Sequence, residues 1–160
     1  MKNLILLFVS CVLLGCSSDE TPELIETPFV PFNITPTLIS KRNNIQPVGI
    51  TQQNVIYNSE SDWNALLNQI DSFYQPFGIN FTQLHFTETN IDFAKFSVIA
   101  VFDKVYGSGG YSIDITNIVE NENNITVTVA NLQTGNASSV ITQPYHIVKI
   151  PKTSKPFVFN

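Results

Sequence analysis

The apolar residues of this chain follow more than one period, and the first clear period is helical. Four apolar residues fall on one face of a helix: Trp63, Leu66, Leu67 and Ile70. Ser59 is placed to accept a hydrogen bond from the first-turn N–H groups, and Pro76 and Gly78 end the pattern. The sequence therefore predicts one principal helix between Ser59 and Pro76, with Trp63 in the core.

The second half of the chain shows strand patterns. Residues 96–102 are apolar on both faces, which predicts a central strand covered on both sides. Residues 111–116 and 125–129 alternate around the polar turn 120–124, which predicts an antiparallel hairpin with one buried and one wet face. Three residues of the first run are expected on the wet face: Ser112, Asp114 and Thr116.

Shorter apolar runs predict further strands at 55–57, 145–150 and 157–159. Together with the single strong helix, these runs predict an α+β fold. We expect a mostly antiparallel β-sheet or small sandwich with one principal helix packed on it.

A glycine-rich turn joins the central strand to the hairpin. It runs through Tyr106, Gly107, Ser108, Gly109, Gly110 and Tyr111. With the polar loop 131–143, it is our predicted partner-binding surface. The alternative is that the glycines only permit the strand connection and that Tyr111 packs in the core. The turn opens no helix, so it does not have the form of a phosphate-binding loop.

The start of the chain has the pattern of an export signal. Lys2 precedes an apolar stretch, and Leu13-Leu14-Gly15-Cys16 resembles the lipobox of bacterial lipoproteins. Residues 1–15 are therefore predicted to be a signal peptide, and Cys16 is predicted to be lipidated. We expect an outer-membrane lipoprotein of the bacterial cell envelope, periplasmic or surface-exposed, held to the membrane by its N-terminal lipid.

Residues 16–46 are predicted to be an acidic, proline-rich tether, and residues 47–160 the folded domain. The tether carries Pro22, Pro28, Pro31 and Pro36, and such a composition favours extended chain. Apolar residues between Phe29 and Ile39 leave a second possibility open, in which part of this segment docks on the domain as an added strand.

Composition excludes several classes of function. The formal net charge is −5, and no basic cluster is present, which argues against a nucleic-acid partner. The 2 cysteines both lie in the first sixteen residues, so nothing downstream can form a disulfide or a cysteine metal site. We expect no metal and no cofactor.

Acid–base groups are few and scattered. The plausible ones are Asp92, Asp103, Asp114, His85 and His146. Their spacing predicts no set of nucleophile, base and orienting group, so we expect no catalytic residue and no enzyme activity.

From about Gln53 onward the chain resembles the family of the protease complex subunit PrcB, in its C-terminal domain. The resemblance rests on Asp62-Trp63-Asn64-Ala65-Leu66, the turn Gly107–Ser112, and Gln143-Pro144-Tyr145-His146-Ile147-Val148-Lys149-Ile150. The turn departs from the expected Pro-Thr-Gly-Gly-Tyr type at Ser108. The resemblance implies a non-catalytic accessory or protein-binding role beside a cell-envelope protease. A second hypothesis is a small β-domain protease inhibitor that presents the Gly-Gly-Tyr loop.

Overall fold

The computed structural model describes residues 27–43, 46 and 48–160. The predicted signal peptide, Cys16 and the start of the tether lie outside the described residues. The helical segments are α1 (Glu60–Tyr74), the 3-10 turn η1 (Gln75–Phe77) and α2 (Phe81–His85). The strands are β1 (Phe32–Asn33), β2 (Thr37–Arg42), β3 (Gln53–Tyr57), β4 (Phe96–Phe102), β5 (Asp114–Glu120), β6 (Ile125–Ala130), β7 (Tyr145–Pro151) and β8 (Phe157–Phe159).

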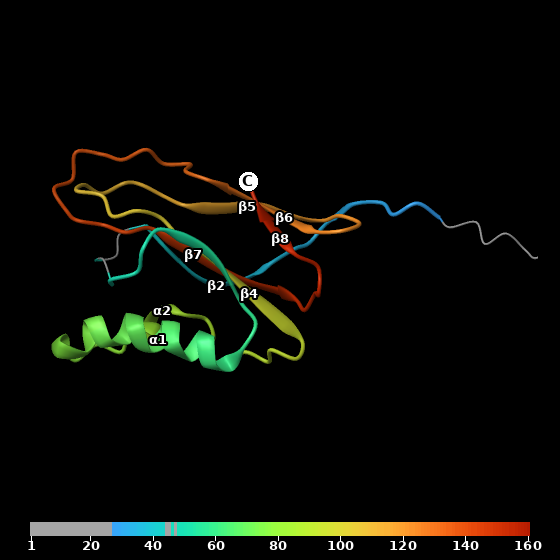
Figure 1. Ribbon diagram of the computed structural model, residues 1–160. Helices are drawn as coiled ribbons and strands as arrows, with labels where there is room; N and C mark the ends of the chain where they lie inside the picture. Colours follow the sequence, from blue (N-terminus) through green and yellow to red (C-terminus); the bar gives the residue numbers. More distant parts are fainter. Residues whose placement is uncertain (1–26, 44–45, 47) are drawn as a thin grey trace, which may run out of the picture.

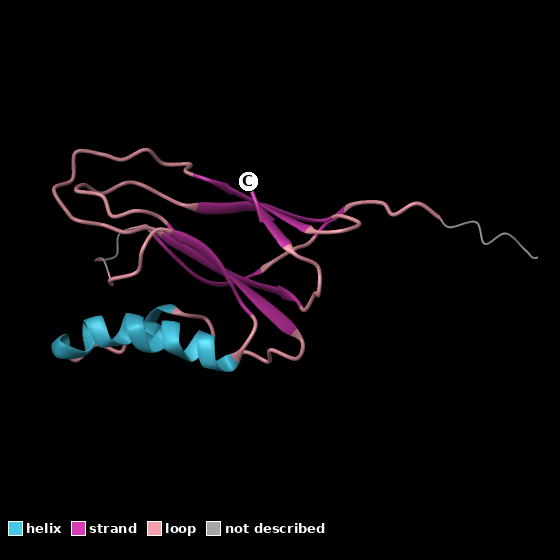
Figure 2. Ribbon diagram, viewed as in Figure 1, coloured by secondary structure: helices cyan, strands magenta, loops and turns pink. Residues whose placement is uncertain are grey.

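The described elements form three layers (Figure 1). An outer sheet has the strand order β1-β5-β6-β8, and a middle sheet has the order β2-β7-β4-β3. The helices cover the face of the middle sheet that points away from the outer sheet (Figure 2). Neighbouring strands are antiparallel except for the parallel pair β6–β8. The predicted α+β fold, with an antiparallel-rich β part and one main helix, is confirmed.

Helix α1 begins and ends where the sequence indicates. The Ser59 side chain accepts a hydrogen bond from the Asp62 backbone N–H at 3.2 Å. Gly78 takes a left-handed conformation with φ of 70° just after η1, which ends the helical segment. All four predicted face residues are buried, and Trp63 donates its indole N–H to the Thr89 carbonyl at 2.7 Å.

Strand β4 is covered on both sides, as its continuous apolar run predicts. Val98, Ala100 and Phe102 belong to the core that faces the helices. Ile99 belongs to the second core, between the two sheets, with Val148 of β7. Because side chains alternate along a strand, this one strand supplies both cores.

The predicted hairpin forms as β5 and β6, but its wet face is wrong at two positions. Ser112 and Asp114 are only 2% and 4% exposed. They are buried because Ser112 donates to Asp114 at 2.5 Å and Lys41 pairs with the same carboxylate, so both polar groups are satisfied. The ladder also shifts register between Ile115 and Asn117, which breaks strict alternation.

The boundary near residue 47 also needs correction. Strand β2 pairs with β7 along the middle sheet, and Ile39 is fully buried in the core facing the helices. The folded unit therefore includes residues that we assigned to the tether, and the added-strand alternative describes them better. An apolar side chain that fills the edge of a core stays there because its removal would expose the surrounding surface to water.

Candidate functional site

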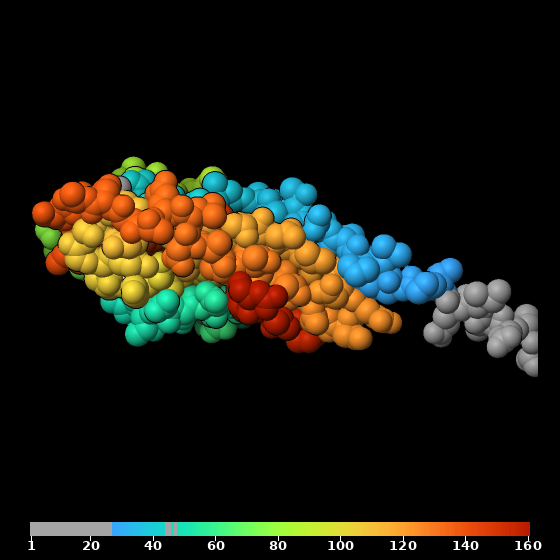
Figure 3. Space-filling view, turned by 90° about the horizontal axis from the view of Figure 1, so that it is seen from above, coloured from blue at the N-terminus to red at the C-terminus, as the bar shows by residue number. Residues whose placement is uncertain are grey.

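The glycine-rich turn and the polar loop 131–143 form one structure, which we call the loop arm (residues 103–113 and 131–143). Its two segments pair through backbone hydrogen bonds along their length. The Tyr106 N–H donates to Thr142 at 2.8 Å, and the Gly109 N–H donates to Ser138 at 3.1 Å. Figure 3 shows the two segments, yellow and orange, side by side at one end of the molecule. The two stretches predicted as one contact surface are thus brought together.

Two glycines make this pairing possible. Gly110 has φ of 79° and Gly135 has φ of 100°, in the region that side chains with a Cβ rarely adopt. A Cβ on Gly135 would stand 2.5 Å from the Tyr111 ring carbon Cζ, and one on Gly110 would stand 2.6 Å from the Asn136 amide nitrogen. The glycines therefore serve both the backbone conformation and the close approach of the two segments.

The two tyrosines of the turn stack on each other. Their ring centroids are 3.6 Å apart and the ring planes differ by 9°. Tyr111 is only partly buried and belongs to neither core cluster, because its ring lies between Tyr106 and Gly135 instead. The alternative that Tyr111 packs in the core is therefore wrong, although the geometric role of the glycines is real.

A buried carboxylate anchors the base of the arm. Asp103 is 3% exposed and accepts hydrogen bonds from the Tyr106 hydroxyl at 2.8 Å and from the Asn131 amide at 2.7 Å. These bonds tie the start of each arm segment to one point. Burial, and then the hydrogen bond to Asp103, raise the pKa of Tyr106 to about 12.

The outer surface of the arm carries apolar side chains in water. Their exposed fractions are 50% for Val105, 67% for Leu132, 42% for Val140 and 54% for Ile141. Leu132, Val140 and Ile141 lie within the predicted loop 131–143, whereas Val105 lies outside the predicted surface because it is a single apolar residue without a periodic pattern. A rigid arm with several exposed apolar groups has the character of a protein-contact surface.

The structure brings Asp114 near His146, whose pKa is lowered mainly by burial while the Asp114 charge acts to raise it, but it does not gather the predicted acid–base groups into one site. The His85 ring lies 3.1 Å from Arg42, whose charge adds to burial in lowering the pKa of the imidazole. The His146 ring accepts a hydrogen bond from the Ile115 N–H at 3.0 Å. Asp92 pairs with Lys95 on the surface. No group of three or more metal-ligating side chains occurs in the part of the chain that the structure describes.

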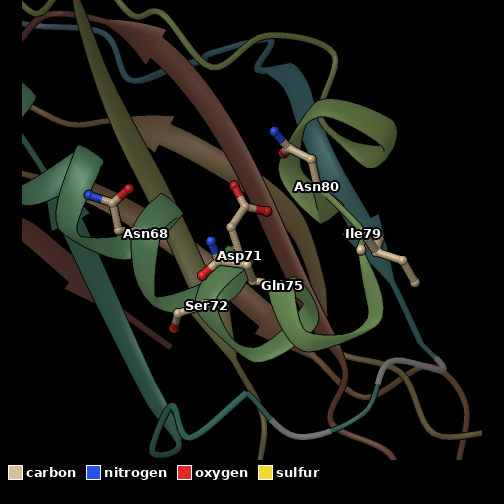
Figure 4. A pocket seen from close by; sticks show the side chains of 7 residues that line it. Asn68, Asp71, Ser72, Gln75, Ile79 and Asn80 are labelled. Atoms are coloured by element: carbon tan, nitrogen blue, oxygen red, sulfur yellow. The ribbon is translucent and has the colours of Figure 1, made fainter.

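A surface cavity of about 510 Å³ lies at the end of α1 (Figure 4). Asp71 lines it, but its carboxylate is occupied by the N–H and hydroxyl of Thr82 at 2.8 and 2.6 Å. Figure 4 shows Ser72 and Ile79 pointing in different directions from Asp71, so the lining does not converge on one point. This arrangement caps α2 and offers no catalytic geometry.

The fold and the arm together define a small β-rich module without an assembled reaction centre among its described residues. A family model described as PrcB C-terminal matches residues 97–151, from β4 through β7, and so includes the whole arm. Over this segment the chain is similar to the C-terminal domain of the PrcB family, as its resemblance indicated. The match begins at Ser97, later than the resemblance traced from Gln53. No curated protein and no solved structure matches the chain.

Proposed function

We propose that this protein is a lipoprotein of the bacterial cell envelope that binds a partner protein through its loop arm and has no catalysis of its own. The observation that carries the proposal is the position of the arm. In Figure 1 the first described residues leave the body at one end, and the arm stands at the opposite end. A chain tethered by Cys16 in the outer membrane therefore presents the arm away from the lipid.

The anchor rests on the sequence. The lipobox-like Leu13-Leu14-Gly15-Cys16 ends an apolar stretch of signal-peptide length. None of the helices in the described ranges is long and apolar enough to cross a membrane. Several acyl chains on Cys16 would hold the protein firmly to a bilayer.

The partner class follows from the family. The PrcB family indicates an accessory role in association with a protease complex. The arm supports this role physically, because its hydrogen-bonded ladder is already ordered and little conformational entropy is lost on binding. We therefore propose an envelope protease as the partner and the exposed apolar side chains of the arm as its contact.

The inhibitor hypothesis has no comparable support. An inhibitory loop must extend into the cleft of its enzyme, whereas the carbonyl groups of Gly109 and Gly110 accept bonds from Asn136 and Gly135 within the arm. The Tyr111 ring also lies flat on Tyr106.

Two variants test the anchor and the contact. Cys16→Ala should leave the protein out of the membrane fraction, and continued attachment after signal cleavage would exclude lipidation at this residue. Leu132→Asp should keep the melting temperature and weaken co-purification with the envelope protease. Leu84→Asp is the matched control, because Leu84 is 66% exposed on α2 while Leu132 is 67% exposed on the arm. Equal co-purification of both variants would remove the arm from the contact.

A further inference from the structure

The two described sheets end in four edge strands, and three of these edges are protected. A free edge presents unpaired N–H and C=O groups, so proteins cover it, shorten it or place lysine, proline or a bulge on it. Strand β2 uses several of these devices. It carries Lys41 and Arg42, its register shifts between Leu38 and Ser40, and the Thr87 N–H donates to the Ile39 carbonyl at 2.9 Å.

The edges of the outer sheet are protected by length and by proline. Strand β1 has 2 residues and stands between Pro31 and Pro36. Strand β8 has 3 residues and follows Pro156. Neither edge is long enough to template another strand.

Strand β3 has none of these protections. Its 5 residues, Gln53–Tyr57, include no charge and no proline, and they pair with β4 in unbroken register. No backbone group of β3 bonds to any described residue outside this ladder. Because β3 is the last strand of the middle sheet, alternate backbone groups on its outer side are free to accept a further strand.

A groove of about 360 Å³ runs along β3 beside α1. Val55, Tyr57 and the buried Leu66 give it an apolar lining, and Asp62 and Gln69 are its polar groups. Burial, and then the nearby Asp62 carboxylate, raise the pKa of the Tyr57 hydroxyl. A strand added here would place alternate side chains against apolar surface and close to one carboxylate.

The negative charge beside β3 favours a basic segment of another protein over a second copy of this chain. Helix α1 carries Glu60, Asp62 and Asp71 and has no lysine or arginine. Lys152 donates to the Asn58 side chain at 2.8 Å, just beyond the end of β3. Two copies paired through β3 would bring two such acidic helices to the same side of the joined sheet, and like charges oppose that arrangement.

We propose that β3 is a second binding site, where an extended polypeptide segment of another protein adds a strand to the middle sheet. The segment carries apolar or β-branched residues for the groove and a lysine or arginine that reaches Asp62. This site is distinct from the loop arm, so one module holds a partner at two separate surfaces.

The test uses the full chain in detergent solution and three synthetic peptides. The first alternates valine and threonine between terminal lysines, the second replaces the lysines by glutamates, and the third is the lysine peptide with alternate backbone nitrogens methylated. We expect the lysine peptide to shift the NMR signals of the β3 amides in a saturable way. The glutamate peptide should bind about tenfold more weakly, and the methylated peptide should not bind.

Two variants identify the site. Asn54→Lys places a charge on the exposed edge and should abolish binding, whereas Thr116→Lys, on an exposed position of β5, should not change it. Asp62→Asn keeps the backbone N–H that bonds to Ser59 and should remove most of the preference for lysine over glutamate.

Three results would overturn the proposal. The first is that none of the peptides shifts the β3 amides, and the second is that the methylated peptide binds like its parent. The third is a concentration-dependent dimer that Asn54→Lys abolishes, which would assign the edge to a second copy. The assay involves neither Cys16 nor the arm, so Leu132→Asp should bind the lysine peptide normally whatever its effect on the protease.

Discussion

Residues 32–42 and residues 131–141 have comparable compositions but opposite positions in the fold. Both are rich in polar residues, contain scattered apolar ones and lack a clear period. The first segment places Ile39, fully buried, in the core beneath the helices. In the second, every residue is exposed. The difference shows that a short apolar run is buried only where another layer of the fold packs against it.

The neighbours of each segment explain this outcome. Strand β2 lies against β7, whose other neighbour is β4, so its inward side chains meet the α1 face. The loop arm extends beyond the ends of the sheets, and its segments pair mainly with each other. Backbone hydrogen bonds order both regions, but β2 adds the buried Ile39 whereas residues 131–141 bury no apolar side chain, and apolar burial supplies most of the free energy of folding.

The largest effect should follow from removing residues 27–43. This deletion takes away β1, β2 and the buried Ile39, and it leaves one edge of the core open to water. We expect the remaining chain to lose its cooperative thermal transition, measured by calorimetry. Replacing residues 134–139 of the arm by a short glycine linker should keep that transition. A sharp transition for the chain that lacks 27–43 would restore the domain boundary near Val48.

A matched pair of isoleucines measures the same contrast by single substitutions. Ile39→Ala should lower the free energy of unfolding by about 2–5 kcal/mol, as large-to-small changes in a core do. Ile141→Ala, at a side chain 54% exposed, should change it by about 0.5 kcal/mol or less. Urea unfolding checks both. Similar losses for the two variants would mean that the arm is an integral part of the core.

Substitutions at two glycines of the arm test whether the backbone conformation and close packing at Gly135 contribute to stability. Gly135→Ala puts a Cβ at positive φ and against Tyr111, so it should destabilise by about 1–3 kcal/mol. Gly107→Ala is the control, because a Cβ there meets nothing within 4 Å. Denaturant midpoints measure the difference. If both alanines are tolerated equally, the close packing of the two arm segments contributes nothing to stability.

The smallest expected effect is a dependence of folding stability on pH, caused by His146 of β7. Burial, and then the charge of Lys41 on β2, lower the pKa of His146 to about 4, from an ordinary value of 6.5. The unfolded state therefore binds a proton more readily, so stability is complete above pH 6.5 and falls as the pH drops toward about 4.

His146→Asn should flatten this part of the stability–pH curve, read from urea midpoints at each pH. His85→Asn is the control, because His85 lies at the surface end of α2 and its pKa is also lowered. If the stability–pH curve is unchanged in His146→Asn but flattened in His85→Asn, the pH dependence comes from His85 and the prediction for His146 is wrong.

Local patterns predicted the elements of the body well. The face of α1, its Ser59 cap and the doubly covered β4 all follow from spacing and from single-residue preferences. The buried Ser112 and Asp114 could not be predicted in this way, because their burial depends on Lys41, which is far away in the sequence. Within the loop arm, the turn Tyr106–Tyr111 and the loop 131–143 were predicted as a contact surface, and the rest of the arm was not.

The sequence by itself determined which residues form helix and strand and the α+β class, since periodicity, capping and turn residues act between near neighbours. Only the tertiary structure decided that β2 joins the body, that Tyr111 stacks on Tyr106, and that no other described strand pairs with the outer edge of β3. Each of these outcomes depends on which distant segment occupies the adjacent space. Long-range pairing sets that choice, and no local pattern encodes it.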